Sequence, residues 1–214
     1  MKVIAVLNQK GGSGKTTIAT HLARALQLDG ADVLLVDSDP QGSARDWAAV
    51  REDQPLTVVG IDRPTIDRDV KNVARKVDFV VIDGAPQAAD LAVSAIKAAD
   101  FVLIPVQPSP LDGWASAEML ALVTEARIYR PELAARFVLN RCDARTVLAR
   151  ETVETLADHD PPALATAIGQ RVAFAAAVQS GRLVSELDEG TPAAREIAAL
   201  ADEIDRLPIE RTAR

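Results

Sequence analysis

Aromatic side chains are scarce in this chain of 214 residues, where four Phe, two Trp and one Tyr make up 3% of the sequence. Hydrophobic residues nevertheless account for 48% of the chain, so its core has to be built from Val, Ile, Leu and Ala. Such side chains suit a buried parallel sheet covered by closely packed helices. The length predicts one α/β domain, which we expect to span residues 1–207 and to be followed by a short tail at 208–214.

Cysteine is almost absent, and long hydrophobic runs are missing. The single cysteine, Cys142, excludes an internal disulfide and any metal site built from several cysteines of one chain, and it fits a reducing compartment. No apolar run approaches the length of a membrane span, and strand-like sequence starts at Lys2, which leaves no room for a signal peptide. We therefore expect a cytoplasmic protein that does not bind a membrane.

Positive charge is also in deficit, with 24 Lys and Arg against 31 Asp and Glu and a net charge of −7. This balance excludes a surface that attracts nucleic acid all round. Any such binding has to come from a local basic patch, of the kind that two subunits build together.

Apolar segments alternate with helical patterns along the whole chain. Strands are expected at 2–7, 33–37, 56–60, 78–83, 100–105 and 135–140, with a short extended piece around 163–167. Helices are expected near 15–29, 42–51, 65–76, 88–98, 112–130, 145–157, 171–180 and 191–207. This alternation predicts βαβ crossovers and hence a doubly wound, mostly parallel sheet with 56–60 at its edge. Ligands of such sheets bind at the carboxyl ends of the strands.

The most informative segment is the glycine-rich loop Asn-Gln-Lys-Gly-Gly-Ser-Gly-Lys-Thr-Thr at residues 8–17, between the first strand and the first helix. Glycines let backbone N–H groups turn toward an anion, and the helix N-terminus adds its positive dipole end, so this loop predicts a phosphate-binding loop (P-loop). Lys15 is expected to reach the β- and γ-phosphates, and the Thr16 hydroxyl to bind Mg²⁺. A dinucleotide-binding loop is disfavoured, because Thr17 stands where a third glycine is needed.

Carboxylates follow two other buried strands. The second expected strand ends at Asp37, with Asp39 two residues later, and the fourth ends at Asp83. Carboxylates at such positions are costly unless they serve a cation or a polar network. We expect Asp83 to hold the Mg²⁺ shell beside the P-loop. For Asp39, the alternative to a role in the reaction is that it merely caps the helix that starts at Gly42.

The P-loop departs from the general Walker A pattern, because Gln9 occupies the usual first glycine position and a second lysine, Lys10, precedes Lys15 by five residues. This Lys-Gly-Gly-x-Gly-Lys-Thr form resembles the deviant Walker A of the ParA/MinD ATPase family. The strings Asp-x-Asp-x-Gln at 37–41 and Pro-Val-x-Pro-Ser-Pro-Leu-Asp at 105–112 resemble those of small plasmid-partition ParA proteins. The resemblance covers roughly residues 1–207, without the N-terminal helix-turn-helix domain of larger members.

The resemblance implies roles for particular residues. In that family the extra lysine, here Lys10, crosses a dimer interface to the nucleotide of the other subunit, and the second aspartate, here Asp39, positions or activates the attacking water. An Asn-Arg pair, here Asn140 and Arg141, lies beside the adenine, and the proline-rich wall that includes Pro108 lies near the nucleotide. The expected catalytic residues are Lys10, Lys15 and Asp39; the expected nucleotide-binding residues are Lys10, Gly11, Gly12, Ser13, Gly14, Lys15, Thr16, Thr17, Asp83, Pro108, Asn140 and Arg141; the expected Mg²⁺ ligands are Thr16, Asp39 and Asp83.

The function implied by the resemblance is that of an ATPase that uses ATP and Mg²⁺ to partition plasmid or chromosomal DNA. Its ATP form would be a nucleotide-sandwich homodimer that lies on the nucleoid by binding non-specific DNA, and a centromere-binding or adaptor protein would stimulate slow hydrolysis. The cargo stays open, since relatives of this kind also position protein clusters or microcompartments. The candidate DNA contacts are Arg145, Arg150, Arg171, Arg182 and Arg195.

Other branches fit the sequence less well. A membrane-bound MinD-like regulator needs a basic amphipathic C-terminal helix, whereas the last helix here carries Glu196, Asp202, Glu203 and Asp205. Iron–sulfur relatives need more cysteine ligands than Cys142 supplies. A small-molecule ligase of the dethiobiotin synthetase type shares the loop and the fold but not the lysine at the position of Lys10.

Overall fold

The computed structural model describes residues 1–53, 55–143, 145–157 and 159–209, with the backbone alone for 110–116 and 157. The strands are β1 (Lys2–Val6), β2 (Val33–Asp37), β3 (Thr57–Gly60), β4 (Phe79–Asp83), β5 (Phe101–Val106), β6 (Ala134–Cys142) and β7 (Ala163–Gly169). The helices are α1 (Lys15–Leu28), α2 (Ser43–Ala49), α3 (Ile66–Val73), α4 (Ala89–Ala98), α5 (Pro110–Tyr129), α6 (Val147–Ala157), α7 (Val172–Gln179), α8 (Val184–Leu187) and α9 (Pro192–Arg206).

The described strands form one sheet in the order β3-β2-β4-β1-β5-β6-β7, and all neighbours are parallel. The expected doubly wound sheet is therefore confirmed, and the segment near 56–60 lies at its edge as predicted. The chain runs from β1 out to β2 and β3, returns to β4, and then crosses to β5 on the other side of β1. The loop after β1 thus leaves the sheet where the winding direction switches, which is where ligands bind in open α/β sheets.

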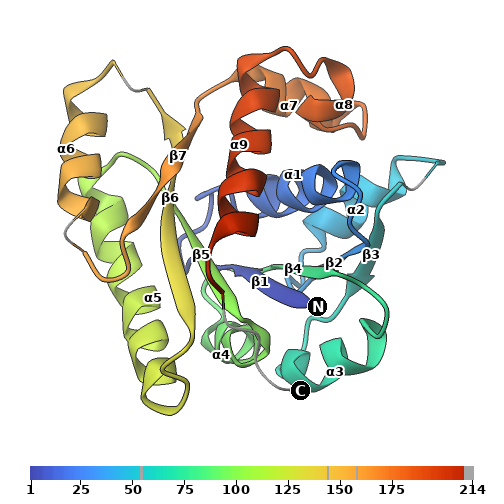
Figure 1. The fold of residues 1–214 in the computed structure, drawn as a ribbon, viewed down its shortest axis with the longest axis horizontal. Helices are drawn as coiled ribbons and strands as arrows, with labels where there is room; N and C mark the ends of the chain where they lie inside the picture. The colour runs from blue at the N-terminus through green and yellow to red at the C-terminus, as the bar shows by residue number, and fades with distance from the viewer. Residues whose placement is uncertain (54, 144, 158, 210–214) are drawn as a thin grey trace.

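Two hydrophobic layers cover the sheet (Figure 1). Helices α1, α2, α7, α8 and α9 pack on one face, while α3, α4 and α5 pack on the other. Strand side chains alternate between the layers, so Ile4 and Val6 of β1 enter the first and Val3 and Ala5 enter the second. Both faces are apolar because both are buried, which explains the continuous Val, Ile and Leu runs of the strands.

Helix α9 contributes its apolar stripe to the first layer. Ile197, Leu200 and Ile204 are spaced by three and four residues and are fully buried. The stripe therefore packs in the core, as the ordinary core pattern of this helix predicts. No helix in the described part of the chain is long and apolar enough to cross a membrane.

The structure corrects the sequence analysis in three places. Helix α8 was not expected, because its four residues are too few for a periodic signal. Strand β7 extends to Gly169, two residues beyond the predicted extended piece. The proline-rich connection predicted at 105–112 is shorter in the structure, since Pro105 lies within β5 and Pro110 begins α5. Proline fits the first turn of a helix, where its missing N–H has no intrahelical partner to lose.

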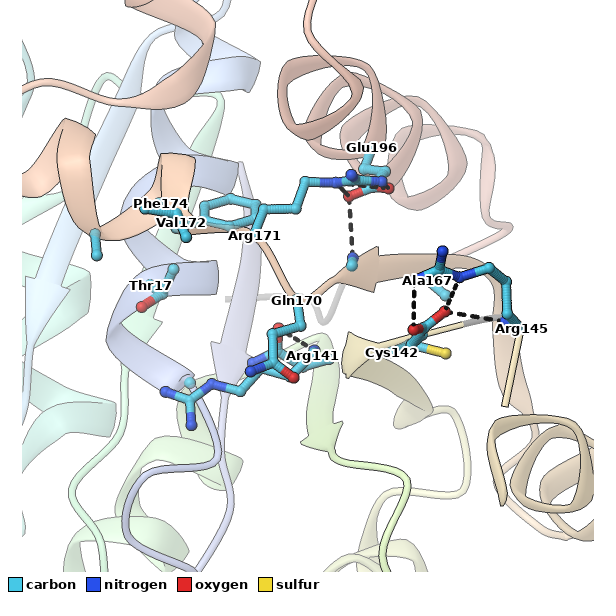
Figure 2. A pocket seen from close by; sticks show the side chains of 15 residues that line it. Thr17, Arg141, Cys142, Arg145, Ala167, Gln170, Arg171, Val172, Phe174 and Glu196 are labelled. Atoms are coloured by element: carbon cyan, nitrogen blue, oxygen red, sulfur yellow. Dashed lines mark hydrogen bonds and ion pairs between the residues drawn. The ribbon is translucent and has the colours of Figure 1, made fainter. Parts of the chain in front are cut away.

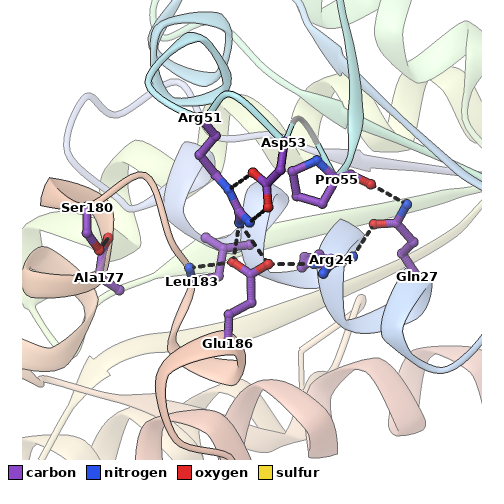
Figure 3. Close-up of polar contacts among 9 residues, drawn as sticks. All are labelled: Arg24, Gln27, Arg51, Asp53, Pro55, Ala177, Ser180, Leu183 and Glu186. Atoms are coloured by element: carbon purple, nitrogen blue, oxygen red, sulfur yellow. Dashed lines mark hydrogen bonds and ion pairs between the residues drawn. The ribbon is translucent and has the colours of Figure 1, made fainter.

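The short helix α8 carries a carboxylate, Glu186, that binds groups from several parts of the chain. Glu186 accepts hydrogen bonds from Nε of Arg24 on α1 at 2.9 Å, from Nη1 of Arg51 at 2.8 and 2.7 Å, and from the backbone N–H of Leu183 at 3.0 Å (Figure 3). Burial alone would raise the pKa of Glu186, but the bonds from Arg51, Leu183 and Arg24 outweigh it and hold the pKa below its ordinary value. This carboxylate therefore fastens α1 and the segment after α2 to the C-terminal part of the chain.

Replacing Glu186 by Gln tests this fastening. We expect Glu186→Gln to lower the free energy of unfolding by about 2 kcal/mol, because it leaves two half-buried guanidinium groups without their shared carboxylate. Urea denaturation followed by circular dichroism measures the change. The matched control is Asp53→Asn, which removes another carboxylate from Arg51 but one whose side chain is 66% exposed. Equal losses in the two variants would contradict a special role for Glu186.

Candidate functional site

The P-loop has the backbone that the sequence predicts. Gly12 and Gly14 have φ angles of 75° and 96°, in the left-handed region that favours glycine. A Cβ at Gly14 would also collide with the side-chain amide of Asn140, whereas nothing lies within 4 Å of the corresponding positions on Gly11 and Gly12. The backbone of the loop is therefore open at Gly11 and Gly12 and closely packed at Gly14. It leads directly into α1, whose first turn has no side-chain cap, so its N–H groups face the loop.

Three amide side chains from strand ends fix the P-loop in place. Asn8 donates to the Pro105 carbonyl at 2.7 Å, and Asn140 donates to the Ser13 carbonyl at 2.8 Å. Gln107 donates to the Gly12 carbonyl at 2.8 Å. The ends of β1, β5 and β6 are therefore tied together around the loop. The sequence analysis missed Asn8 and Gln107, although a polar residue directly after a buried strand is a signal that could have found both.

Lys15 lies inside this cradle with a side chain that is almost completely buried. Its Nζ donates to the carbonyl oxygen of Lys10 at 3.0 Å, and the backbone N–H of Lys10 donates to Asn8 Oδ1 at 2.9 Å. Burial lowers the pKa of Lys15, while the carboxylates of Asp83 and Asp39 act in the opposite direction. The structure therefore brings together Lys15, Asp39 and Asp83, as the sequence predicts.

Asp83 is the most unusual group in the site. Its carboxylate is fully buried, and neither oxygen has a hydrogen-bond partner of normal geometry among the described residues. Burial raises its pKa to about 7, against the opposing influence of the nearby Thr16 hydroxyl, and the neighbouring Asp37 adds to the rise. Folding a carboxylate into such a place costs free energy unless a cation is bound there.

These features fit a nucleotide with its magnesium ion. The unpartnered oxygens of Asp83 and the hydroxyl of Thr16 offer hard oxygen ligands, which Mg²⁺ prefers. Within the described part of the chain, the buried hydroxyl of Ser13 also has no hydrogen-bond partner. The open backbone of Gly11 and Gly12 supplies N–H groups for phosphate oxygens.

Asp37 belongs to a polar network at the end of β2. Its carboxylate accepts from the backbone N–H groups of Asp39 and Arg45, both at 3.0 Å. It therefore supports the loop that carries Asp39. Asp39 itself is half-buried, and its Oδ1 accepts from the Gln41 N–H at 2.9 Å. This contact closes a turn before α2, whose N-cap is Gly42 without a side-chain cap, so in the described contacts Asp39 does not cap that helix. Its role in the reaction stays a prediction.

A cleft of about 870 Å³ opens beside the P-loop on the side of β6 and β7 (Figure 2). Asn140, Arg141 and Cys142 line it together with Phe174 from α7, while the ion pair of Arg171 and Glu196 closes one end. Arg141 has a φ of 51°, which turns the chain sharply after Asn140. The cleft has the size and the mixed lining of a nucleotide-base site.

Asn140 lines this cleft, whereas Pro108, another residue expected to bind the nucleotide, does not. Both polar ends of the Asn140 amide are engaged, because its Oδ1 accepts from the Arg141 N–H at 2.9 Å while its Nδ2 holds Ser13. One N–H of the amide is left to meet a base, so a contact to adenine stays a prediction. Pro108 is half-buried between β5 and α5 and is not among the residues that line the cleft.

The five arginines proposed to bind DNA have different surroundings. Arg145 and Arg171 line the base-side cleft and pair with Asp143 and Glu196. Arg195 lines a separate groove between α1 and α9, where it donates to the Gly190 carbonyl. Arg150 and Arg182 are exposed. Whether any of them contacts DNA stays a prediction.

Comparison with known proteins agrees with this site. A family model described as the CobQ/CobB/MinD/ParA nucleotide binding domain matches residues 4–184. The chain belongs to the ParA/MinD family. Members of this family are ATPases, and the fold and the P-loop found here are those of the family.

Relatives in this family carry out different tasks. The chain is 37% identical over 207 residues to the maintenance of carboxysome distribution protein A of Halothiobacillus neapolitanus, covering 94% of this chain and 95% of that protein. It is 31% identical to the chromosome-partitioning ATPase Soj of Thermus thermophilus, covering 94% of each. The cobyrinic acid a,c-diamide synthase of Mycobacterium smegmatis, solved with an ATP analogue and magnesium, is 26% identical with a TM-score of 0.77, covering 96% of this chain and 94% of that one.

The buried charge of Asp83 predicts a pH effect on the nucleotide-free protein. Because the folded protein holds a proton on Asp83 up to about pH 7 and the unfolded chain releases it near pH 4, this group's stabilising contribution is present below pH 4 and lost as the pH rises through 7. Asp83→Asn cannot ionise, so it should exceed the wild type in stability at pH 8 by about 2 kcal/mol. Below pH 4 the two should be alike.

Urea denaturation of wild type and variant at matched pH values measures this difference. Titrating groups that do not interact with Asp83 cancel in the comparison, including His21, whose burial lowers its pKa to about 4. Asp78→Asn is the control, because it removes an exposed carboxylate at the opposite end of the same strand. A wild type that is as stable as Asp83→Asn at pH 8 would show that Asp83 is not a strained charge.

Proposed function

We propose that this protein is an ATP-hydrolysing positioning protein whose ATP-bound homodimer distributes a large cargo along DNA. The observation that carries the proposal is the buried and unpartnered carboxylate of Asp83 beside Lys15 in the P-loop. Such a carboxylate requires a cation, and a P-loop requires phosphates, so the two together favour Mg²⁺ and a nucleoside triphosphate as ligands. Membership in an ATPase family supports ATP as that triphosphate.

Each residue of the site then has a task. Lys15 and the backbone N–H groups from Gly11 to Thr16 hold the β- and γ-phosphates and keep them against the end of β1. Thr16 and Asp83 would hold the magnesium ion, which when bound neutralises the charge that develops on the phosphates. Asp39 would orient the attacking water from the edge of the site. The base-side cleft would receive the adenine.

Lys10 is proposed to act on the nucleotide of the second subunit. Its main chain is fixed on both sides, since its N–H is bound by Asn8 and its carbonyl by Lys15. The side chain therefore starts from a defined point at the rim of the cradle, where a second subunit facing the P-loop would bring its own phosphates. The dimer would enclose both nucleotides and exclude bulk water, apart from the water that attacks the phosphate.

The cargo can be DNA or a protein body. The carboxysome relative supports a protein compartment, while Soj supports a chromosome, and both similarities cover 94% of this chain. The higher identity to the carboxysome relative favours the protein cargo over the plasmid or chromosome favoured by the sequence. In either case, a partner protein on the cargo would stimulate hydrolysis and release the dimer from the nucleoid.

The two lysines of the P-loop should give different defects. Lys15→Ala should abolish ATP binding, because it removes the buried cation of the cradle. Lys10→Ala should bind ATP nearly as well as the wild type but fail to form the ATP-dependent dimer. Calorimetric titration with ATP and light scattering with and without ATP measure the two properties. Equal loss of ATP affinity in both variants would refute the separate role of Lys10.

DNA binding should require ATP and ignore sequence. A monomer with a net charge of −7 should bind duplex DNA weakly, whereas a dimer can align arginines of two subunits. Asp39→Ala should retain ATP and therefore bind DNA for longer, because hydrolysis no longer resets it. Affinity should fall steeply with salt, since each neutralised phosphate contributes roughly −0.9 to the log–log slope.

The test is a titration of labelled non-specific duplex with ATP, ADP or no nucleotide at two salt concentrations, using wild type, Asp39→Ala and Lys15→Ala. Lys15→Ala is the control, because it should stay in the nucleotide-free form under all conditions. Binding that does not depend on nucleotide, or no binding at low salt, would defeat the DNA-based mechanism. An Asp39→Ala variant that hydrolyses ATP at the wild-type rate would mean that Asp39 is only a turn residue.

A further inference from the structure

One side chain, Arg45, holds the loop that carries Asp39. Arg45 lies in the first turn of α2, and its Nη2 donates to the Asp39 carbonyl at 3.0 Å. Its backbone N–H donates to Asp37 Oδ2 at 3.0 Å, and its Nε lies 3.4 Å from the same oxygen. The guanidinium thus links the main chain of Asp39 to a carboxylate at the end of β2.

Asp37 completes the arrangement from the other side. Its carboxylate is fully buried, and its Oδ1 accepts from the Asp39 N–H at 3.0 Å. The N–H of Asp39 is therefore held by Asp37, and its carbonyl by Arg45 together with the backbone N–H of Gly42 at 2.9 Å. Because both main-chain groups of this residue are fixed, the direction in which its Cα–Cβ bond points is fixed as well.

The fold also shapes a slot for the guanidinium. A Cβ on Gly60, at the end of β3, would lie 2.7 Å from Arg45 Nη1, and one on Gly42 would lie 3.1 Å from Nη2. Asp62 lies at the far end of the slot, with its Oδ2 3.4 Å from Nη2. Two positions without a Cβ and two carboxylates thus surround one arginine, although its side chain remains 37% exposed.

We propose that Arg45 is a positioning residue for ATP hydrolysis, which acts by fixing the main chain of Asp39 beside Lys15 and Asp83. The inference rests on the proposed role of Asp39 and adds the side chain on which that role depends. Arg45 touches neither of those two groups in the described contacts, so its effect passes through Asp39. A displacement of a reacting group by about 1 Å can cost a hundredfold in rate, which sets the scale of the effect.

The main test is Arg45→Met, which keeps a long unbranched side chain and removes the guanidinium. Single-turnover hydrolysis of Mg-ATP should slow by about ten- to a hundredfold. The affinity for ATP should stay within about twofold of the wild type, because the P-loop is untouched. Weaker ATP binding with an unchanged rate would overturn the proposal, since it would assign Arg45 to nucleotide binding.

Gly60→Ala tests the same geometry with the arginine in place. The new methyl group would occupy the slot, and the flexible guanidinium would have to move away from Asp39. We expect slower hydrolysis with unchanged ATP affinity, as in Arg45→Met. Arg63→Met is the matched control, because it removes another arginine near the end of β3, one whose ion pair with Asp69 lies away from Asp37 and Asp39. It should hydrolyse ATP at the wild-type rate.

The fluorescence of Trp47 reports, without any nucleotide, how well α2 is packed. Trp47 lies on this helix, two residues after Arg45, and is 7% exposed. In a Trp114→Phe background it is the sole tryptophan of the chain. Acrylamide quenching of its fluorescence should rise by about twofold in Arg45→Met as the loop and the first turn loosen, and should not change in Arg63→Met.

The outcomes separate this inference from the proposed function. A wild-type protein that does not hydrolyse ATP refutes the proposed function itself. A wild type that hydrolyses ATP while both Arg45→Met and Gly60→Ala keep its rate refutes the role of Arg45 alone. If Arg45→Met fails to fold, as judged by circular dichroism, the rate of Gly60→Ala decides.

Discussion

The rest of the site depends on a charge buried without a partner. Asp83 ends a central strand, and the parallel register places it opposite Asp37 on β2 and Val6 on β1. Two carboxylates side by side at this edge repel each other, and burial adds to the cost. Asp37 is satisfied by backbone N–H groups and Arg45, but Asp83 is not. The empty protein therefore carries an electrostatic strain that ligand binding relieves, which couples affinity to the stability of the fold.

Three amide side chains hold the backbone around this strained carboxylate. Asn8, Gln107 and Asn140 each hold a backbone carbonyl of the strand ends or of the P-loop. Such bonds keep the loop open against collapse onto Lys15, whose ammonium group finds only the Lys10 carbonyl within the described contacts. A site that is held open and charged before its ligand arrives has less reorganisation to undergo on binding.

Most of the fold could be predicted from the sequence because its signals are local. Apolar runs that end in Asp37 and Asp83 predict both the strands and the carboxylates at their ends. The P-loop is predicted from a glycine pattern of only ten residues. Asn8 and Gln107 make contacts with residues 97 and 95 positions away in the sequence. A local pattern can mark these two residues but cannot predict their partners. The bonds between Asp37 and Arg45 span only eight residues, but they form because α2 turns back over the end of β2.

The network around Glu186 has a consequence for how the protein can be divided. The match to the family ends at residue 184, and all the residues that the sequence predicts to bind the nucleotide lie before that point. A fragment cut at this boundary would look complete in sequence and would still lose Glu186 and α9. Arg24 and Arg51 would then face each other without their common anion, and Ile18 and Leu22 of α1 would lose the helix that covers them. We therefore expect the segment needed for a stable fold to be longer than the segment that carries the predicted nucleotide-binding residues.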